Sequence, residues 1–481
     1  MSITAPESRL THVHLRWATP VPEDISILGD AWERSYGDLR WSGLIPERIM
    51  PWYFLAVDAH SLHGYGVKTG AAALCFWQLD ASGVSLWLNV CNGGEGVELG
   101  ERELLAATVI TRRGEFGEEP MAAARAFCGQ MCSVPRRSSP IYGSNDWYYA
   151  YGKNSATQIV RDADLVASVS PSTGPRPFTI IDDGWQNKDR FPDMHALAAS
   201  IRERQVRPGL WIRPMQAAAD TDSKLLLPTQ RFGRTYQQYS APAYDPTIPD
   251  ALDIVLHKVS QAVGWTYELI KHDFSTYEIF GRWGFEMSGQ PTAPGWNFHD
   301  RTRTNAEIVR DLYQAIRRKA GESAVLVGCN TIGHLAAGLF DAQRTGDDVS
   351  GKNWERTRRM GVNTLANRLP QHHAFFLLDP DCVPITTSTP WRCNRQWLDV
   401  IARSGTVLLV SAEAAALGDE QRQAIRESFA LAASAGDPTA PEDWRENTTP
   451  ETWNFKTREQ AGHIVRKYDW CQDTGAWPFE I

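Results

Sequence analysis

The sequence predicts an α/β fold: a (β/α)8 TIM barrel with an N-terminal β-sandwich-like domain and a small C-terminal β appendage. Residues 1–135 contain short β-prone runs separated by turns, whereas residues 141–436 alternate eight times between strand-like and helix-like patterns. Residues 437–481 are too few for a further large domain. A doubly wound sheet rarely needs eight parallel strands, so the number of repeats favours a barrel.

The N-terminal domain is expected to be a sandwich closed by one helix. Its apolar runs alternate only in part and are separated by Gly, Asp and Ser. A helix over residues 120–132 has Pro120 near its first turn, where proline is favoured. The polar stretch 133–140 marks the boundary with the barrel. The strand-like runs are 12–17, 51–58, 71–79, 84–91 and 104–113.

In the barrel, a helix-like run follows each strand-like run, although the fifth helix is short or missing. Ser155 is expected to cap the first helix. The strands are expected at 141–147, 178–185, 207–214, 267–274, 324–330, 339–348, 374–383 and 406–414. The helices are expected at 155–169, 194–205, 250–265, 304–320, 354–369, 394–405 and 419–436. In the appendage, 452–459 and 462–470 are expected to be strands.

The composition excludes several classes of partner. The net charge is -8 and there is no basic stripe, so no nucleic-acid partner is expected. No apolar run approaches the roughly 18 residues of a membrane span, and the first residues lack a signal-peptide pattern. The eight cysteines are scattered and complete no zinc pattern. We therefore expect reduced thiols and a cytoplasmic location, and we expect no metal and no cofactor. The 19 tryptophans fit a carbohydrate enzyme, since sugar rings stack on aromatic faces.

Polar side chains occur at the carboxyl ends of almost all the predicted barrel strands. Strand ends of a parallel barrel converge on one rim, where active sites lie. Crowded carboxylates raise one another's pKa, so structure alone gains little from them. Asp183-Gly184 alone is typical of a turn, but the set predicts an active site. Its members are Asp146, Trp147, Asp182, Asp183, Trp185, Trp211, Arg213, Lys271, Asp273, Cys329, Asn330, Arg344, Asp347, Asp348, Asp379 and Asp381.

The stretch 267–274 carries the most informative pair. Lys271 and Asp273 are two residues apart, so on a strand they point the same way. A cation beside a carboxylate keeps it ionised, and a retaining glycosidase needs an ionised carboxylate as nucleophile. The alternative is an ion pair at a strand end without chemistry.

Six motifs together resemble glycoside hydrolase clan D, and most closely family 36, which contains α-galactosidases and raffinose synthases. They are FTIIDDGWQ (178–186), RPGLWIRP (207–214), LIKHDF (269–274), RTGDD (344–348) with Trp354, DPDCV (379–383) and ERSYGDLRW (33–41). The resemblance implies a retaining hydrolase of terminal α-galactosyl residues that takes an oligosaccharide or other glycoside as substrate. It also implies a homo-oligomer assembled through the N-terminal domain, with Trp41 near a neighbour's site.

The resemblance also implies roles for individual residues. Asp273 would be the nucleophile and Asp348 the acid/base, with Asp347 as the other candidate. Asp348 is less directly paired with a cation than Asp273 is, so we expect Asp348 to have a raised pKa. The substrate would be held by Asp182 and Asp183 at the 4- and 6-hydroxyls, by Lys271 and Arg344 at other hydroxyls, by Trp147 and Trp211 along the ring, and by the region of Cys329 and Asn330 near C2.

Four alternatives stay open. The enzyme could be an α-N-acetylgalactosaminidase, or it could transfer galactosyl groups to a sugar, as raffinose synthases do. A metal-dependent barrel enzyme would use Asp182, Asp183, Asp273, Asp347 and His272 as ligands. A non-catalytic sugar-binding barrel is the fourth.

Overall fold

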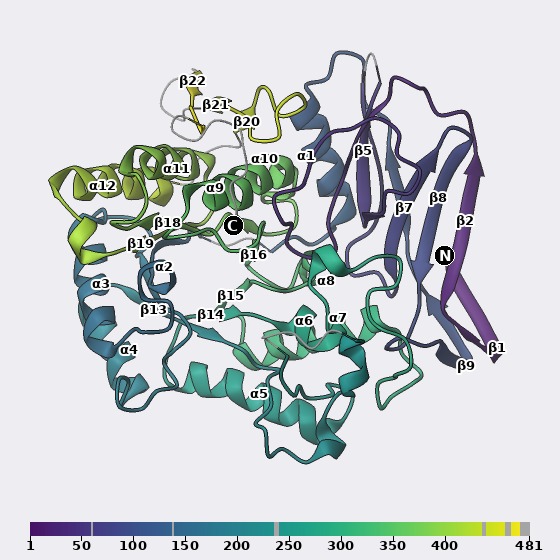
Figure 1. Cartoon of the computed structure of the whole chain (residues 1–481), viewed down its shortest axis with the longest axis horizontal. Helices are drawn as coiled ribbons and strands as arrows, with labels where there is room; N and C mark the ends of the chain where they lie inside the picture. Colours follow the sequence, from purple (N-terminus) through teal and green to yellow (C-terminus); the bar gives the residue numbers. More distant parts are fainter. Residues whose placement is uncertain (59–60, 137–138, 235–239, 435–438, 457–462, 472–481) are drawn as a thin grey trace.

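The computed structural model describes residues 1–58, 61–136, 139–234, 240–434, 439–456 and 463–471. In Figure 1 the N-terminal strands stand at the right, the barrel and its helices occupy the left, and the C-terminal strands lie at the top. Within these ranges, every helix is too short or too polar to cross a bilayer. All eight cysteines are free.

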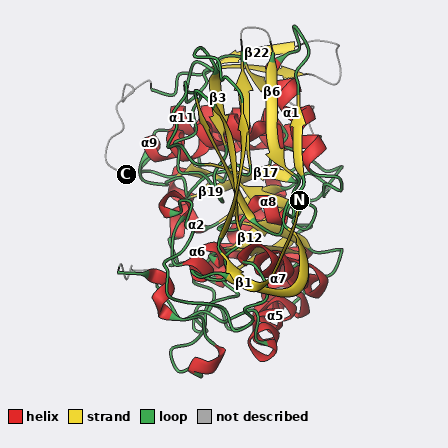
Figure 2. Ribbon diagram, turned by 90° about the vertical axis from the view of Figure 1, so that its right-hand side faces the viewer, coloured by secondary structure: helices red, strands yellow, loops and turns green. Residues whose placement is uncertain are grey.

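The N-terminal part contains two four-stranded antiparallel sheets and one two-stranded pair (Figure 2). The orders are β10-β6-β5-β3, β2-β8-β7-β4 and β1-β9. The larger sheets meet at Phe54 of β5 and Trp77 of β7, whose ring centroids lie 5.6 Å apart. The bounds are Ser2–Leu10 (β1), His12–Ala18 (β2), Ser26–Gly29 (β3), Met50–Pro51 (β4), Tyr53–Val57 (β5), Leu62–Val67 (β6), Leu74–Asp80 (β7), Gly83–Asn89 (β8), Val97–Leu105 (β9), Val109–Arg112 (β10) and Pro120–Met131 (α1).

The barrel strands form a ring in which all neighbours are parallel. The order is β17-β16-β15-β14-β13-β12-β11-β19-β18. β17 and β18 are two halves of the seventh strand, interrupted next to Asp381, whose φ of 74° is left-handed. The Val407 amide donates to the Leu378 carbonyl at 2.9 Å, so β17 also meets the segment before β19. The predicted fold class is therefore confirmed.

The barrel elements follow the predicted order. The strands are Tyr142–Asn145 (β11), Phe178–Ile181 (β12), Arg207–Ile212 (β13), Leu269–His272 (β14), Val325–Gly328 (β15), Ala342–Arg344 (β16), Leu377–Asp379 (β17), Cys382–Ile385 (β18) and Leu408–Ala412 (β19). The main helices are Ala156–Val169 (α3), Met194–Glu203 (α4), Pro249–Gly264 (α5), Asn305–Ala320 (α7), Trp391–Ser404 (α11) and Asp419–Ala433 (α12). Short helices at the rim are Trp147–Ala150 (α2), Ser275–Phe280 (α6), Gly333–Ala336 (α8), Trp354–Thr357 (α9) and Thr364–Arg368 (α10), with 3-10 turns at Ser223–Leu225 (η1), Thr229–Phe232 (η2), Gly284–Glu286 (η3), Leu369–Gln371 (η5) and Ala414–Ala416 (η6).

Local sequence explains both the agreements and the differences. Ser155 caps α3 by accepting from the Gln158 amide, as predicted, and the fifth helix is reduced to α8. The sixth helix is interrupted by a π-helical segment, Arg358–Asn363 (η4), between α9 and α10. The predicted strand 339–348 has only three residues in β16, because the chain then leaves the ring to form a polar loop.

Alternation along β14 decides which side chains face the inside of the ring. Leu269 joins the small apolar cluster that includes Ile180 and Val327, whereas Ile270 joins the larger cluster. The His272 ring lies 5.8 Å from Tyr313 of α7 and therefore faces the helices. Lys271 and Asp273 fall on the same side as Leu269, as the two-residue spacing predicts.

The C-terminal appendage is a three-stranded sheet of Ala440–Pro441 (β20), Thr452–Lys456 (β21) and His463–Lys467 (β22). Trp41 of the N-terminal part packs edge-on against Trp444 of this same chain, with ring centroids 5.1 Å apart. Parts of the predicted elements and linker, at 137–138, 435–436, 457–459 and 462, lie outside the described residues.

Candidate active site

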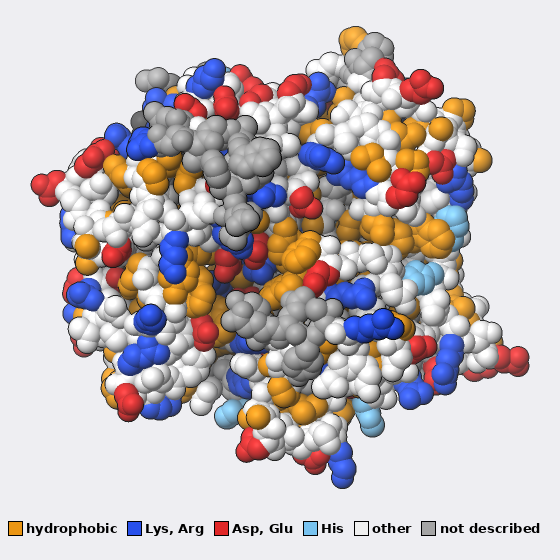
Figure 3. Space-filling view, in the orientation of Figure 1, with side chains coloured by type: hydrophobic (Ala, Val, Ile, Leu, Met, Phe, Trp, Pro, Cys, Tyr) orange, Lys and Arg blue, Asp and Glu red, His pale blue; other side chains and the backbone are white. Residues whose placement is uncertain are grey.

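A cavity of about 420 Å³ lies at the carboxyl ends of the barrel strands. It is lined mostly by residues at the ends of the barrel strands and by a segment that precedes the barrel. Figure 3 shows acidic and basic side chains gathered beside hydrophobic ones near the middle of one face of the molecule. The lining residues are Arg34, Tyr36, Trp147, Asp182, Asp183, Trp211, Arg213, Lys271, Asp273, Phe274, Trp283, Phe285, Asp347, Asp348 and Arg356.

The Asp273 carboxylate, just after β14, is held by three donors. The Trp211 indole donates to Oδ2 at 2.9 Å, and the amides of Phe274 and Asn330 donate to Oδ1 at 2.7 and 3.0 Å. Burial raises the pKa of Asp273, but the cations Arg34 and Lys271 and the indole bond outweigh it and hold the pKa below its ordinary value. The carboxylate is thus ionised at neutral pH and fixed in orientation.

The direct partner of Lys271 is Asp182 rather than Asp273. Its Nζ lies 2.7 Å from Asp182 Oδ2, and Asn145 Nδ2 donates to the same oxygen at 2.7 Å. Lys271 therefore acts on Asp273 through its field and not through a shared ion pair. The Lys-x-Asp pattern could not reveal this, because the closer carboxylate comes from another strand.

The two carboxylates after β12 have different surroundings. Asp182 is buried, whereas Asp183 is half-buried and accepts from Gly184 and Gln186 at 2.9 and 3.0 Å. Gly184 has a φ of 111°, and a Cβ there would lie 2.5 Å from Asn154 Oδ1, so this stretch is a glycine-dependent turn as well as part of the cavity wall. Burial raises the pKa of Asp183 above its ordinary value.

Asp146 lies behind Asp182 and does not line the cavity. It accepts from the Asp182 amide at 2.7 Å and from Asn154 Nδ2 at 2.5 Å. Burial and the neighbouring Asp182 raise the pKa of Asp146 to about 8. This predicted strand-end carboxylate thus supports the wall by hydrogen bonding.

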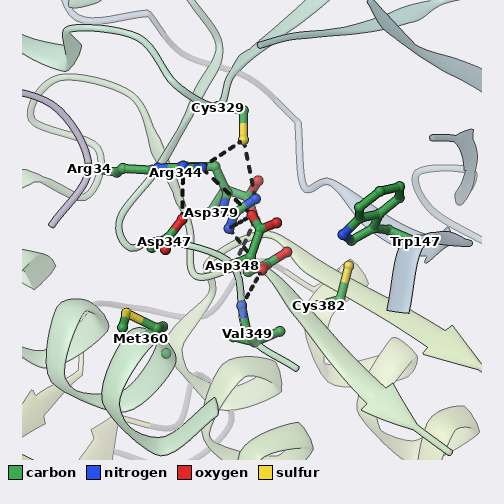
Figure 4. A network of polar contacts seen from close by, with 12 residues as sticks. Arg34, Trp147, Cys329, Arg344, Asp347, Asp348, Val349, Met360, Asp379 and Cys382 are labelled. Atoms are coloured by element: carbon green, nitrogen blue, oxygen red, sulfur yellow. Dashed lines mark hydrogen bonds and ion pairs between the residues drawn. The ribbon is translucent and has the colours of Figure 1, made fainter. Parts of the chain in front are cut away.

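Arg344, at the end of β16, holds Asp348 and Asp381, and Figure 4 shows Arg344 beside Asp348. Arg344 Nη2 lies 2.8 Å from Asp381 Oδ2 and 3.1 Å from Asp348 Oδ1. Asp381 also accepts from the Val349 amide at 3.0 Å and from the Tyr148 hydroxyl. The interrupted seventh strand therefore places a buried carboxylate that orients Arg344.

The predicted raised pKa of Asp348 is wrong for the unliganded protein. Burial raises the pKa of this group, but Arg344 and Arg34 outweigh burial and lower the pKa to about 2. Both cations contact Oδ1, at 3.1 and 3.6 Å, and 39% of the side chain is exposed. The sequence did not show that an arginine from outside the barrel reaches this carboxylate.

Asp347 is engaged on both oxygens. Arg34 lies 2.8 Å from Oδ1, and Arg356 lies 2.6 Å from Oδ2. Only 18% of its side chain is exposed, less than half the value for Asp348. Asp348 is thus the carboxylate with the more accessible oxygen.

Arg34 and Glu33, which precede the barrel, were missed as site residues. Ser35 joins the loop after β16 through two backbone bonds of 2.9 Å, to Thr345 and Asp347. Glu33 accepts from the Gly284 amide at 2.8 Å and also from the Tyr36 hydroxyl and the Asn330 side chain. The signal was the stretch 33–41, which resembles the family but lies far from the barrel in sequence.

The aromatic walls are partly as predicted. Trp147 and Trp211 line the cavity, and the other aromatic side chains of its walls are Tyr36, Phe274, Trp283 and Phe285. Trp185 is turned away, since its indole donates to the Trp211 carbonyl at 2.9 Å. Trp283 and Phe285 lie in a rim segment without strand or helix periodicity, so no pattern marked them.

Cys329, Asn330 and Arg344 lie behind the cavity surface. Cys329 Sγ is 3.3 Å from Arg344 Nη1 and 3.7 Å from Arg34 Nη1, while Asn330 connects Asp273 with Glu33. His272 faces the helices, apart from the four carboxylates proposed with it as metal ligands. Among the described residues, no group of three or more His, Cys, Asp or Glu is arranged to hold a metal ion.

Comparison with known proteins gives a consistent fold. No model of a protein family matches the chain. An α-galactosidase from Thermus thermophilus, solved with p-nitrophenyl α-D-galactopyranoside, superposes with a TM-score of 0.65 at 19% identity, covering 95% of this chain and 92% of that one. A family 36 α-galactosidase, AgaA from Geobacillus stearothermophilus in complex with 1-deoxygalactonojirimycin, gives 0.63 at 11% identity, covering 94% and 67%. The resemblance predicted from the motifs is thereby confirmed for the fold.

Proposed function

We propose that this chain is a retaining glycoside hydrolase that removes terminal α-galactosyl residues. The observation that carries the proposal is the pair Asp273 and Asp348, two carboxylates from different strands that line one cavity. The shared fold with the α-galactosidases adds support. In contrast to the metal-dependent alternative, the reaction needs only the two carboxylates.

In the first step, Asp273 attacks the anomeric carbon while the bond to the leaving oxygen breaks and Asp348 protonates that oxygen. In the second step, Asp348 takes a proton from water, which displaces Asp273 and restores the anomeric configuration. Asp273 suits the nucleophile because its three donors keep it ionised and fixed. Asp348 suits the acid/base because its second oxygen is accessible, whereas both oxygens of Asp347 are engaged.

Asp348 must gain a proton before it can act as an acid. Its low pKa reflects nearby cations, chiefly Arg344 and Arg34, acting on a partly exposed group. A bound sugar removes the water around Asp348, and desolvation favours the neutral form. We infer that substrate binding itself raises the pKa of Asp348, so the acid forms in the complex.

Recognition of the sugar is assigned to the charged wall opposite the acid/base. Asp182 and Asp183 would accept from the 4- and 6-hydroxyls, and Lys271 would donate to a ring hydroxyl. Trp147 and Trp211 supply apolar faces for the ring. Cys329 and Asn330 would shape the C2 region from behind the cavity surface.

The test uses purified protein with nitrophenyl α-galactoside, α-N-acetylgalactosaminide, α-glucoside and β-L-arabinopyranoside. The α-galactoside is expected to give the highest kcat/KM, with galactose as the first-formed α anomer. Asp273→Ala should abolish turnover, and azide should restore it with formation of β-galactosyl azide. Full activity of Asp273→Ala, or a first-formed β anomer from the unmodified protein, would refute the mechanism. Added raffinose or sucrose as acceptor separates hydrolysis from galactosyl transfer.

A further inference from the structure

A second cavity adjoins the proposed active site. Its volume is about 620 Å³, and it shares Tyr36 and Phe285 with the cavity that contains Asp273. The other walls come from residues 30–51, from the rim segment around Gly284, and from Arg359 and Thr448. Tyr36 and Phe285 stand between the two spaces, so a group attached to the sugar's anomeric oxygen would have to extend past these two side chains to reach the second cavity.

Three arginines line this second cavity, and none of them has an acidic side chain within 4.0 Å among the described residues. They are Arg40, Arg48 and Arg359. Arg48 is engaged on the protein itself, donating to the Ile27 carbonyl at 3.2 Å and to Ser42 Oγ at 2.8 Å. Burial is the main cause that lowers the pKa of Arg48, while Arg40 adds to this lowering and Asp38 opposes it.

The acidic residues of this cavity do not balance the arginines. Asp30 is paired with Arg368, which is not part of the lining, at 2.8 Å, and Gln371 donates to its second oxygen at 2.9 Å. Asp38 is exposed and accepts from the Tyr36 amide at 3.2 Å. Among the described residues, the walls therefore hold three cations against one carboxylate that has no ion pair, in a protein whose net charge is -8.

The backbone at Arg359 is also unusual. Arg359 lies in the π-helical segment Arg358–Asn363, directly after α9. Such segments are rare and occur often at functional sites, because the extra residue in the turn redirects side chains. The carbonyl of Arg359 lies close to Gly37, where an added Cβ would be 2.8 Å away, so the segment is packed tightly against the other wall.

We propose that this second cavity binds an anionic group on the leaving part of the substrate, with Arg359 and Arg40 as its ligands. The inference rests on the proposed function and narrows its substrate class to α-galactosides whose aglycone carries a phosphate or carboxylate. A guanidinium that lacks a carboxylate partner in the protein offers donors in a fork that matches either anion. A neutral oligosaccharide would offer no anion to the guanidinium N–H groups of Arg359 and Arg40, which would then be hydrogen-bonded to water.

The test compares three α-galactosides that share an ethylphenyl aglycone and end in a carboxylate, a phosphate monoester or a carboxamide. The terminal group is remote from the glycosidic oxygen, so leaving-group acidity is matched. The charged compounds are expected to exceed the carboxamide in kcat/KM by about fivefold or more, the upper end for a partly exposed ion pair. About 0.5 M NaCl should reduce the preference. The larger of the two ratios identifies the preferred anion.

Variants locate the effect. Arg359→Gln should bring the preference close to one without changing kcat/KM for the carboxamide, and Arg40→Gln, at an exposed position, provides a second variant. Arg318→Gln, an exposed position on α7 outside the cavity, is the matched control and should keep the preference. Hydrolysis of all three compounds at equal rates, or a preference that survives in the Arg40→Gln/Arg359→Gln double variant, would overturn the inference and leave the proposed function intact. Failure to hydrolyse any of them would count against the proposed function itself.

Discussion

Replacing Trp211 by Phe tests how the fold keeps Asp273 ionised. The change keeps an aromatic ring but removes the indole N–H that lies 2.9 Å from Asp273 Oδ2. Both residues are buried, at 4% and 7% exposure, so water does not readily replace the donor. A hydrogen bond to a charged group contributes about 1.5 to 3 kcal/mol. A tenfold change in an ionisation equilibrium corresponds to about 1.4 kcal/mol. The acid limb, which is the low-pH side of the plot of activity against pH, should therefore move up by about one to two pH units.

The direction follows from the sign of the shift. The pKa of Asp273 lies below its ordinary value partly because of this donor, so losing it raises the pKa and removes the nucleophile as the pH falls. The assay is fluoride release from α-galactosyl fluoride between pH 3 and 7. Fluoride leaves without a proton, so the acid limb of kcat/KM, which reports the first step alone, follows Asp273 and not Asp348.

Trp185→Phe is the matched control. It removes the same N–H from a tryptophan that donates to the Trp211 carbonyl at 2.9 Å and to no carboxylate. This variant should keep the acid limb of the unmodified protein. An unchanged limb in a folded Trp211→Phe variant, or equal shifts in both variants, would refute the reasoning.

Two further predictions concern residues around the same cavity. Asp348→Ala should lose far more activity on glycosides with poor leaving groups than on α-galactosyl fluoride, whereas Asp347→Ala should slow both alike; the reverse pattern in kcat/KM would exchange their roles. Burial raises the pKa of Glu33 to about 7, so the folded protein retains a proton that the unfolded chain releases near its ordinary value of 4.5. This group therefore makes the free energy of unfolding fall by about 3 kcal/mol as the pH rises from 4.5 to 7. Thermal melting across that range should be flatter for Glu33→Gln, and an unaltered slope would contradict this account.

The periodicity of the chain was sufficient to predict the barrel and the side on which Lys271 and Asp273 lie. These depend on short-range pattern: a strand alternates, and parallel strand ends meet at one rim. Which charges pair was beyond such reasoning. The ion pair of Lys271 with Asp182 joins β14 to the end of β12, and only the three-dimensional register brings them to 2.7 Å.

The largest error, the pKa of Asp348, has the same origin. Within RTGDD, Asp348 has one obvious cation, Arg344, and the structure adds Arg34 from more than 300 residues earlier in the chain. Trp283 and Phe285 were missed for another reason. Phe285 lies in the three-residue 3-10 turn η3 and Trp283 directly precedes it. In so short an element, no periodicity distinguishes a cavity wall from an ordinary loop.

The short stretch at Glu33, Arg34 and Ser35 makes this barrel dependent on its neighbour. Ser35 bonds to the loop after β16, and Arg34 neutralises the carboxylates that follow it. If that stretch detached, Asp347 and Asp348 would repel each other across an otherwise intact ring of strands. Loss of activity on warming would then follow separation of residues 33–35 from the loop after β16. A barrel expressed without its first 135 residues would therefore lack the cation that Asp347 and Asp348 share, and would also expose the apolar core that it has in common with the N-terminal strands.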